Sequence, residues 1–199
     1  MKSNRHDDLQ QLNHVLNSFI ISKTIPALNK ILEEPVTYTI KKTQTISTTN
    51  IDLFISDFEE KNLMHAVYLK CTGDLHMGVL WHMLEEESKP LAEKILGRLC
   101  TDKSEKLIVS AISEIGNILT ASIVNAISDD TGYKIWSSVP GFATESLRTL
   151  LEAIISDSDY SSDTLIFSTV EFHGLNSGLK LQMLLMQDPK EAKKLVVCG

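Results

Sequence analysis

The sequence predicts an α/β (α+β) fold built from two similar halves. Apolar residues recur at helical spacing over two long segments, residues 9–32 and 106–127. The segments between and after them are rich in β-branched and apolar residues and are broken by turn signals, as expected of strands and hairpins. These segments follow one another in the same order in both halves, which indicates an internal duplication of about 95 to 100 residues.

The first half reads as helix, strand, hairpin and helix. The helix over residues 9–32 is followed by PVTYTIKKTQTI, which predicts a strand, and by a polar connector at STTN. Residues 63–84 contain two apolar runs separated by a Gly-Asp pair, which is typical of a β-hairpin. A helix is expected over about residues 87–99, with Pro90 in its first turn, where a missing N–H is tolerated.

The second half repeats this order. After the helix over residues 106–127, YKIWSSVPGF predicts a strand that runs into a turn, and TESLRTLLEAII predicts a shorter helix. A second hairpin is expected over residues 164–188, and Pro189 opens a final helix. We expect one domain over residues 1–199, with repeated halves at about 6–100 and 104–199.

Composition and charge restrict the class of protein. With 199 residues, 43% of them hydrophobic, the chain can bury a core. The formal net charge of −7 argues against a general nucleic-acid surface, because phosphates would be repelled. The N-terminal stretch is polar, and about 18 consecutive apolar residues occur nowhere, so we expect no signal peptide, no membrane span and a cytoplasmic protein.

The residue types with special chemistry are spread along the chain. The three cysteines are far apart and form no C-x-x-C pair, so reduced thiols are expected. The six histidines contain no H-x-x-x-H pair, and no metal ion of the chain's own is expected. Trp81 and Trp136 lie in apolar strand segments and are expected in the core.

The second long helix carries a polar group on one side. At 100° per residue, one stripe is predicted to face the core: Ile108, Ala111, Ile115, Ile118, Ser122 and Ala126. A second group lies about 120° away and is predicted to be exposed: Ser110, Glu114, Asn117 and Ala121. Gly116 costs about 0.5–1 kcal/mol relative to alanine in a helix, which indicates a close approach to its backbone. Spacing alone leaves two interpretations open, a site that meets a partner and a solvated face with a glycine for helix packing.

Three of these positions, together with Pro140, resemble a known signature. Ser110, Glu114, Asn117 and Pro140 are spaced as Ser-x3-Glu-x2-Asn-x22-Pro, which is similar to the Asp/Ser-x3-Glu-x2-Asn-x22-Pro motif of the CheC/CheX/FliY family of chemotaxis phosphatases. The segments KCTGDLHMGVLWHML and GLNSGLKLQMLLMQD loosely resemble the family's paired strands. The resemblance implies one CheC-like domain of two pseudo-symmetric halves, with two long helices packed on one continuous, mainly antiparallel sheet.

The resemblance also implies a function and roles for these residues. The family's substrate is the phosphoaspartate of a CheY-type response regulator, a signal-transduction protein that supplies its own Mg²⁺ and lysine, so no cofactor of this chain is implied. Hydrolysis then requires a well-placed water, and Asn117 is the residue implied to position it. Glu114 is implied to pair with the receiver lysine, Ser110 to bond at the edge of the site, and Pro140 to fix the neighbouring strand end.

CheC-like proteins often carry the motif on both long helices, but the first helix retains only one position. Aligning HVLNSF with EIGNIL places His14 at the glutamate position and Asn17 at the asparagine position. Gln10 then stands at the acid-or-serine position, and Ile40 where proline is expected. Because imidazole cannot replace a carboxylate as the partner of a lysine, we interpret the first site as degenerate.

Other functions remain open within the same resemblance. CheC-type proteins bind the receptor deamidase CheD, so a non-catalytic adaptor that binds a receiver or CheD is the main alternative to a phosphatase. A flagellar-switch component of the FliY kind is less favoured, because the chain has no added domain.

Overall fold

A seven-stranded sheet forms the centre of the molecule. The structure is a computed structural model that describes residues 5–56, 63–97, 104–157, 160 and 162–198. The strands are β1 (Val36–Ser47), β2 (Met64–Gly73), β3 (Met77–Leu84), β4 (Ile135–Ser137), β5 (Gly141–Glu145), β6 (Thr164–Gly174) and β7 (Lys180–Gln187). Their order is β1-β6-β7-β3-β2-β4, β5 also pairs with β2, and the pairings of the described strands are antiparallel.

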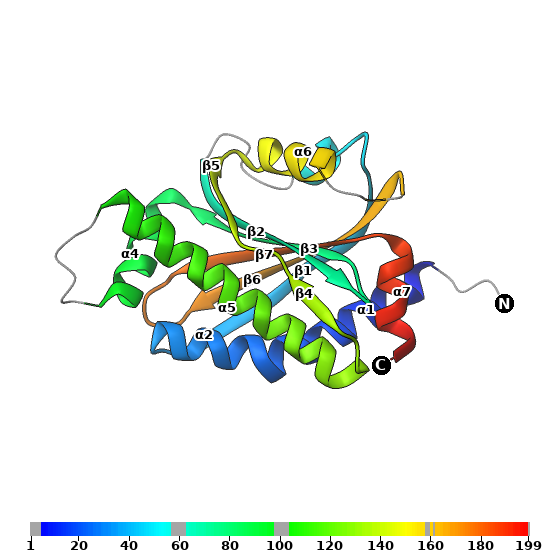
Figure 1. Cartoon of the computed structure of the whole chain (residues 1–199), viewed down its shortest axis with the longest axis horizontal. Helices are drawn as coiled ribbons and strands as arrows, with labels where there is room; N and C mark the ends of the chain where they lie inside the picture. The colour runs from blue at the N-terminus through cyan, green and yellow to red at the C-terminus, as the bar shows by residue number, and fades with distance from the viewer. Residues whose placement is uncertain (1–4, 57–62, 98–103, 158–159, 161, 199) are drawn as a thin grey trace.

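Helices cover both faces of this sheet. They are α1 (Arg5–Phe19), the π-helical turn η1 (Ile20–Thr24), α2 (Ile25–Leu32), α3 (Asp52–Ile55), α4 (Glu85–Leu96), α5 (Glu105–Thr131), α6 (Leu147–Asp157) and α7 (Pro189–Cys198). Figure 1 shows α5 and the continuous segment α1-η1-α2 on one side of the sheet and α6 on the other. The predicted fold class, with two long helices packed on one continuous antiparallel sheet, is therefore confirmed.

The order of elements is the same in both halves. Each half contains a long helical segment, an edge strand that is split in the second half, a short helix, a hairpin and a final helix. The exact boundaries of the halves, about 6–100 and 104–199, stay a prediction. Residues 98–100, at the end of the first half, lie outside the described residues.

Two apolar layers hold the helices to the sheet. One layer lies between the long helices and the sheet, and the other lies between the opposite face and α3 and α6. Trp81 is buried in the first layer, as predicted, and its indole N–H donates to Thr120 Oγ1 on α5 at 3.0 Å. The prediction for Trp136 is wrong, since it is 62% exposed and its ring lies over the edge of the sheet at Gly73.

Several local features depart from the predicted elements. The first long helix contains the π turn directly before Pro26, which has no N–H to continue the regular ladder. The helix after the first hairpin, α4, begins at Glu85, two residues earlier than predicted. It therefore holds Pro90 in its interior. Three consecutive glutamates in its first turn favour this earlier start, because they oppose the positive end of the helix dipole. The short helix α3 was not predicted.

Among the described residues, α5 is the one helix long and apolar enough to cross a membrane by length and composition. Half of its most apolar 18-residue window is buried inside the fold. This burial is expected of a helix that packs on a sheet, and it accounts for the apolar composition of α5.

Glu34 is a buried carboxylate that joins three segments. Its Oε2 accepts hydrogen bonds from the N–H groups of Asn176 and Ser177 at 2.7 and 2.8 Å, in the turn between β6 and β7. Its Oε1 accepts from Lys94 Nζ on α4 at 3.0 Å and from the Ser177 hydroxyl. The Ser177 hydroxyl, followed by Lys94 and the two backbone donors, holds the pKa of Glu34 at about 2, below its ordinary value of 4.5.

We expect Glu34→Gln to lower the free energy of unfolding by about 1.5–3 kcal/mol at pH 7, because a charged acceptor of several hydrogen bonds is lost. The folded state lowers this pKa, so the stabilisation is complete above pH 4.5 and is lost as the pH falls toward 2. Urea denaturation of the wild type and the variant at pH 7 and pH 3 measures the difference, which should shrink at pH 3. Glu33→Gln, an exposed neighbour, is the control. An equal difference at both pH values would contradict the role of the charge.

Candidate functional site

The outward side of α5 presents the predicted polar group. Ser110 and Glu114 are exposed, and Asn117 is half-buried. The opposite side packs on the sheet through Ala111, Ile112, Ile115, Gly116, Leu119, Thr120, Ile123, Val124, Ala126 and Ile127. Because i and i+3 positions are neighbours on a helix, Glu114 and Asn117 lie one turn apart on the same exposed side.

Ile118 also belongs to this exposed side. The prediction that it lies in the core stripe is wrong, since its side chain is 40% exposed. At 100° per residue, Ile118 is about 40° from Glu114 and about 60° from Ile115, so it lies at the border between the two sides. We define the α5 face as Ser110, Glu114, Asn117 and Ile118. The face thus combines a carboxylate, an amide and an apolar contact.

The chemical groups of this face are available to a partner. Among the residues that the structure describes, none forms a hydrogen bond or ion pair with the side chain of Glu114 or Asn117. The Glu114 carboxylate can therefore accept from a cation, and the Asn117 amide offers one acceptor and two donors. In the same described residues, no group of three histidine, cysteine or acidic side chains is placed to hold a metal ion.

Gly116 allows α5 to approach the sheet closely. A Cβ atom at this position would lie 2.6 Å from Val67 Cγ1 and 2.9 Å from Val67 Cβ on β2. The close approach that the sequence indicates is therefore made by the chain's own sheet. This is the helix-packing role left open above, and it fixes the depth at which α5 presents Glu114 and Asn117.

We expect Gly116→Ala to destabilise the fold by about 1–3 kcal/mol through overpacking against Val67, although alanine is the better helix former by about 1 kcal/mol. Chemical denaturation measures this. In a Val67→Ala background the new methyl group has room, so the cost of Gly116→Ala should largely disappear. Stabilisation by Gly116→Ala in the wild-type background would contradict this packing.

Pro140 lies in a bulge beside the α5 helix. Ser137 of β4 pairs with Cys71, and Gly141 of β5 pairs with Tyr68, so three residues of the edge strand face two residues of β2. Within the bulge, Ser138 bonds to Lys70 through its N–H and accepts the Lys70 N–H with its hydroxyl. Proline has no N–H to pair, which suits it to a bulge. The other edge strand, β1, also shifts register by one residue, between Ile40 and Lys42.

The first helix presents its matching residues in the same way. Residues 12–20 and 112–120 have the same succession of buried, half-buried and exposed positions. His14 is exposed like Glu114, and Asn17 is half-buried like Asn117. The alignment of the two helices by sequence therefore also holds for their exposure.

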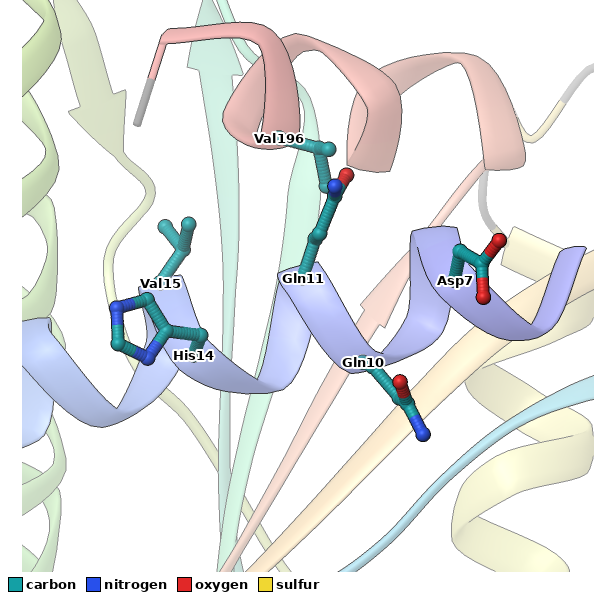
Figure 2. Close-up of a pocket in the computed structure, with 6 residues that line it drawn as sticks. All are labelled: Asp7, Gln10, Gln11, His14, Val15 and Val196. Atoms are coloured by element: carbon teal, nitrogen blue, oxygen red, sulfur yellow. The ribbon is translucent and has the colours of Figure 1, made fainter. Parts of the chain in front are cut away.

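An open pocket lies on this side of α1. It is lined by Asp7, Gln10, Gln11, His14, Val15 and Val196. Figure 2 shows Gln11 extending toward Val196 of α7, whereas Gln10 projects from the opposite side of α1. The side chains that line the pocket do not point toward one another. The pocket therefore does not replace the glutamate that the motif would have at position 14.

Asn17 differs from Asn117 in one contact. The hydroxyl of Tyr38, on β1, donates a hydrogen bond to Asn17 Oδ1 at 2.6 Å. The carbonyl oxygen of Asn17 is thus directed at the edge of the sheet. Sequence analysis missed this contact, because Tyr38 is 21 residues away and no local pattern joins the two.

Comparison with known proteins supports the resemblance at the site. A family model described as the CheC-like family matches residues 107–143. This segment contains α5 from its first turn, the bulge and part of β5. All four signature positions, Ser110, Glu114, Asn117 and Pro140, fall inside it.

The fold as a whole is similar to solved structures of low sequence identity. FliY from Thermotoga maritima has a TM-score of 0.72 at 16% identity, covering 98% of this chain and 96% of that one. A CheX–CheY–BeF3–Mg²⁺ complex from Borrelia burgdorferi has a TM-score of 0.55 at 13% identity, covering 85% of this chain and 96% of that one. The FliM middle domain from H. pylori has a TM-score of 0.59 at 9% identity, covering 97% of this chain and 98% of that one.

The comparisons at the site and over the whole fold agree. This chain and the FliY structure match over nearly their full lengths. The family match covers the signature, and the structural matches cover the surrounding fold. The predicted resemblance of this chain to the CheC/CheX/FliY family is therefore confirmed.

Proposed function

We propose that this chain is a CheC-like phosphatase that hydrolyses the phosphoaspartate of a CheY-type response regulator. The observation that carries the proposal is that Glu114, exposed, and Asn117, half-buried, lie one turn apart on α5, within the CheC-like segment and without a side-chain partner among the described residues. The fold is shared with a CheX protein that was crystallised with CheY, BeF3 and Mg²⁺. That likeness favours a CheY-type receiver as the partner.

Asn117 positions the attacking water. Its carbonyl oxygen accepts a hydrogen bond from the water, which turns the water's lone pair toward phosphorus in line with the bond to the aspartate oxygen. The P–O bond to the aspartate breaks as the water oxygen bonds to phosphorus, and the products are the free carboxylate and inorganic phosphate. Phosphoryl transfer depends mainly on such positioning and on electrostatics, so this chain need not supply a general base.

Glu114 holds the receiver in place against α5. Its exposed carboxylate pairs with the receiver's active-site lysine and places α5 across the phosphorylated pocket. Ile118 adds an apolar contact on the same side, and Ser110 bonds at the edge of the site. Pro140 acts indirectly, through the bulge beside α5. Mg²⁺ belongs to the receiver in this proposal, and both proteins would meet in the cytoplasm.

The decay of a phosphorylated receiver tests the proposal. A purified CheY-type receiver is phosphorylated in Mg²⁺ buffer, and its loss of phosphate is followed with and without this chain at one tenth of the receiver concentration. A phosphatase accelerates the decay of the whole receiver pool, because each molecule acts many times. Unchanged decay at concentrations where the two proteins bind would contradict the proposal.

A non-catalytic adaptor is the second candidate, and the likeness to the FliM middle domain favours it. An adaptor would use the same α5 face to bind a receiver and would leave the phosphoaspartate intact. CheD is the other partner considered for an adaptor. Binding of purified CheD or BeF3-loaded receiver, together with an unchanged decay rate, is the result expected of this candidate.

A further inference from the structure

We propose that Tyr38 silences the first helix by holding the carbonyl oxygen of Asn17, and that two substitutions, at positions 14 and 38, would turn α1 into a second site. Tyr38 is thus a positioning residue that acts through Asn17. The inference rests on the proposed function, because it assigns to Asn17 the chemistry proposed for Asn117.

The exposure pattern of α1 already matches that of α5. Residues 12–20 and 112–120 have the same pattern of burial, so α1 presents His14 and Asn17 to solvent as α5 presents Glu114 and Asn117. The difference between the two helices is therefore one of side-chain chemistry. The loss of the glutamate at position 14 removes the docking charge, but it leaves the amide of Asn17 in place.

Tyr38 prevents the Asn17 amide from positioning a water. Its hydroxyl donates to Asn17 Oδ1 at 2.6 Å, so the oxygen that would hold a water is directed at β1. The tyrosine ring is half-buried and packs near Phe172, with the ring centroids 6.3 Å apart. Burial raises the pKa of Tyr38, which keeps the hydroxyl protonated as a donor. The oxygen keeps a second lone pair, but turning the amide toward a water on the solvent side of α1 would break this well-supported hydrogen bond.

The edge strand of the second half carries a serine, Ser137, on the side where β1 carries Tyr38. Tyr38 pairs with Phe172, and Ser137 pairs with Cys71; Phe172 and Cys71 both belong to the apolar layer beneath the long helices. Residues directly opposite each other in an antiparallel pair point to the same face of the sheet. Tyr38 and Ser137 thus face the helix side of their edge strands. Ser137 is exposed and too short to span the distance that the tyrosine ring covers.

The first experiment rebuilds the site on α1. In an Asn117→Ala background, which removes the proposed second-half site, His14→Glu, Tyr38→Phe and the pair of changes are compared in the receiver decay assay. The pair should raise the decay rate by about tenfold over the background, and each single change by less than about twofold. Adding Asn17→Ala should remove the gain. A full gain with His14→Glu alone, or no gain with the pair, overturns the proposal.

The second experiment introduces a tyrosine hydroxyl into the edge strand of the second half, beside the proposed site. Ser137→Tyr puts a phenol on the corresponding edge strand without changing Glu114 or Asn117, and it should lower activity by about tenfold or more. Ser137→Phe adds the same ring without the hydroxyl and is the matched control, which should keep activity within about twofold. Equal activity of the two variants would overturn the role of the hydroxyl.

A measurement on the free protein separates this inference from the proposed function. In ¹⁵N NMR spectra, Tyr38→Phe should shift the side-chain amide signals of Asn17 and leave those of Asn117 in place. No shift at Asn17 would overturn the proposed role of the Tyr38–Asn17 hydrogen bond, whatever the activity of the chain. Conversely, if the wild-type chain leaves receiver decay unchanged while the Asn17 signals shift, the proposed function fails and the hydrogen bond stands.

Discussion

Asn117→Ala is expected to lower the rate of receiver dephosphorylation at saturation by about 10²-fold, or about 2.7 kcal/mol of barrier. The amide is half-buried on the outward side of α5 and has no partner among the described residues, so its loss removes a group that acts on the water and leaves the fold intact. Affinity for a BeF3-loaded receiver should change by less than about twofold, because docking depends on Glu114. Rates measured at several receiver concentrations separate the two effects.

Asn125→Ala is the matched control for this variant. Asn125 is also exposed on α5, and it lies eight residues, about 12 Å, further along the helix. The same substitution there should keep nearly full activity. If Asn117→Ala kept the wild-type rate, or if Asn125→Ala lost as much, the water-positioning role would be contradicted.

Glu114→Gln is expected to weaken binding of the BeF3-loaded receiver by about tenfold or more at low salt, while the rate at saturation falls less. The amide keeps the shape of the carboxylate but cannot form an ion pair with a lysine. Because salt screens exposed charges, the difference between wild type and variant should become smaller at high salt. Calorimetric titration at two salt concentrations measures both effects.

Glu105→Gln tests whether the effect is specific to position 114. Glu105 is an exposed glutamate in the first turn of the same helix, so the variant has the same change in net charge. Its affinity should stay near that of the wild type. Equal affinity of wild type and Glu114→Gln at low salt would contradict the docking role.

Periodic patterns predicted most of the fold. The two long helical segments, both hairpins and the helix after Pro189 were predicted because their apolar residues recur at fixed local spacing. The errors fall where that spacing is ambiguous or overridden. Ile118 lies at the border of the buried side of α5, and the acidic first turn of α4 moves its start so that Pro90 becomes interior.

The outward placement of the candidate residues on α5 could be predicted, but the contacts around them could not. The outward placement of Glu114 and Asn117 follows from helix geometry alone. The partner of Gly116 is Val67 on β2, and the partner of Asn17 is Tyr38 on β1. Such contacts depend on how the sheet brings distant segments together, and a single sequence carries no local signal for them.

The central claim is that α5 holds the one working site and that the matching side of α1 does not. The most direct test compares Asn17→Ala with Asn117→Ala in the receiver decay assay, with circular dichroism to check that both variants are folded. We predict that Asn17→Ala keeps nearly the full rate and that Asn117→Ala loses nearly all of it. A loss of half or more of the activity in Asn17→Ala would contradict the account and would mean that both helices act.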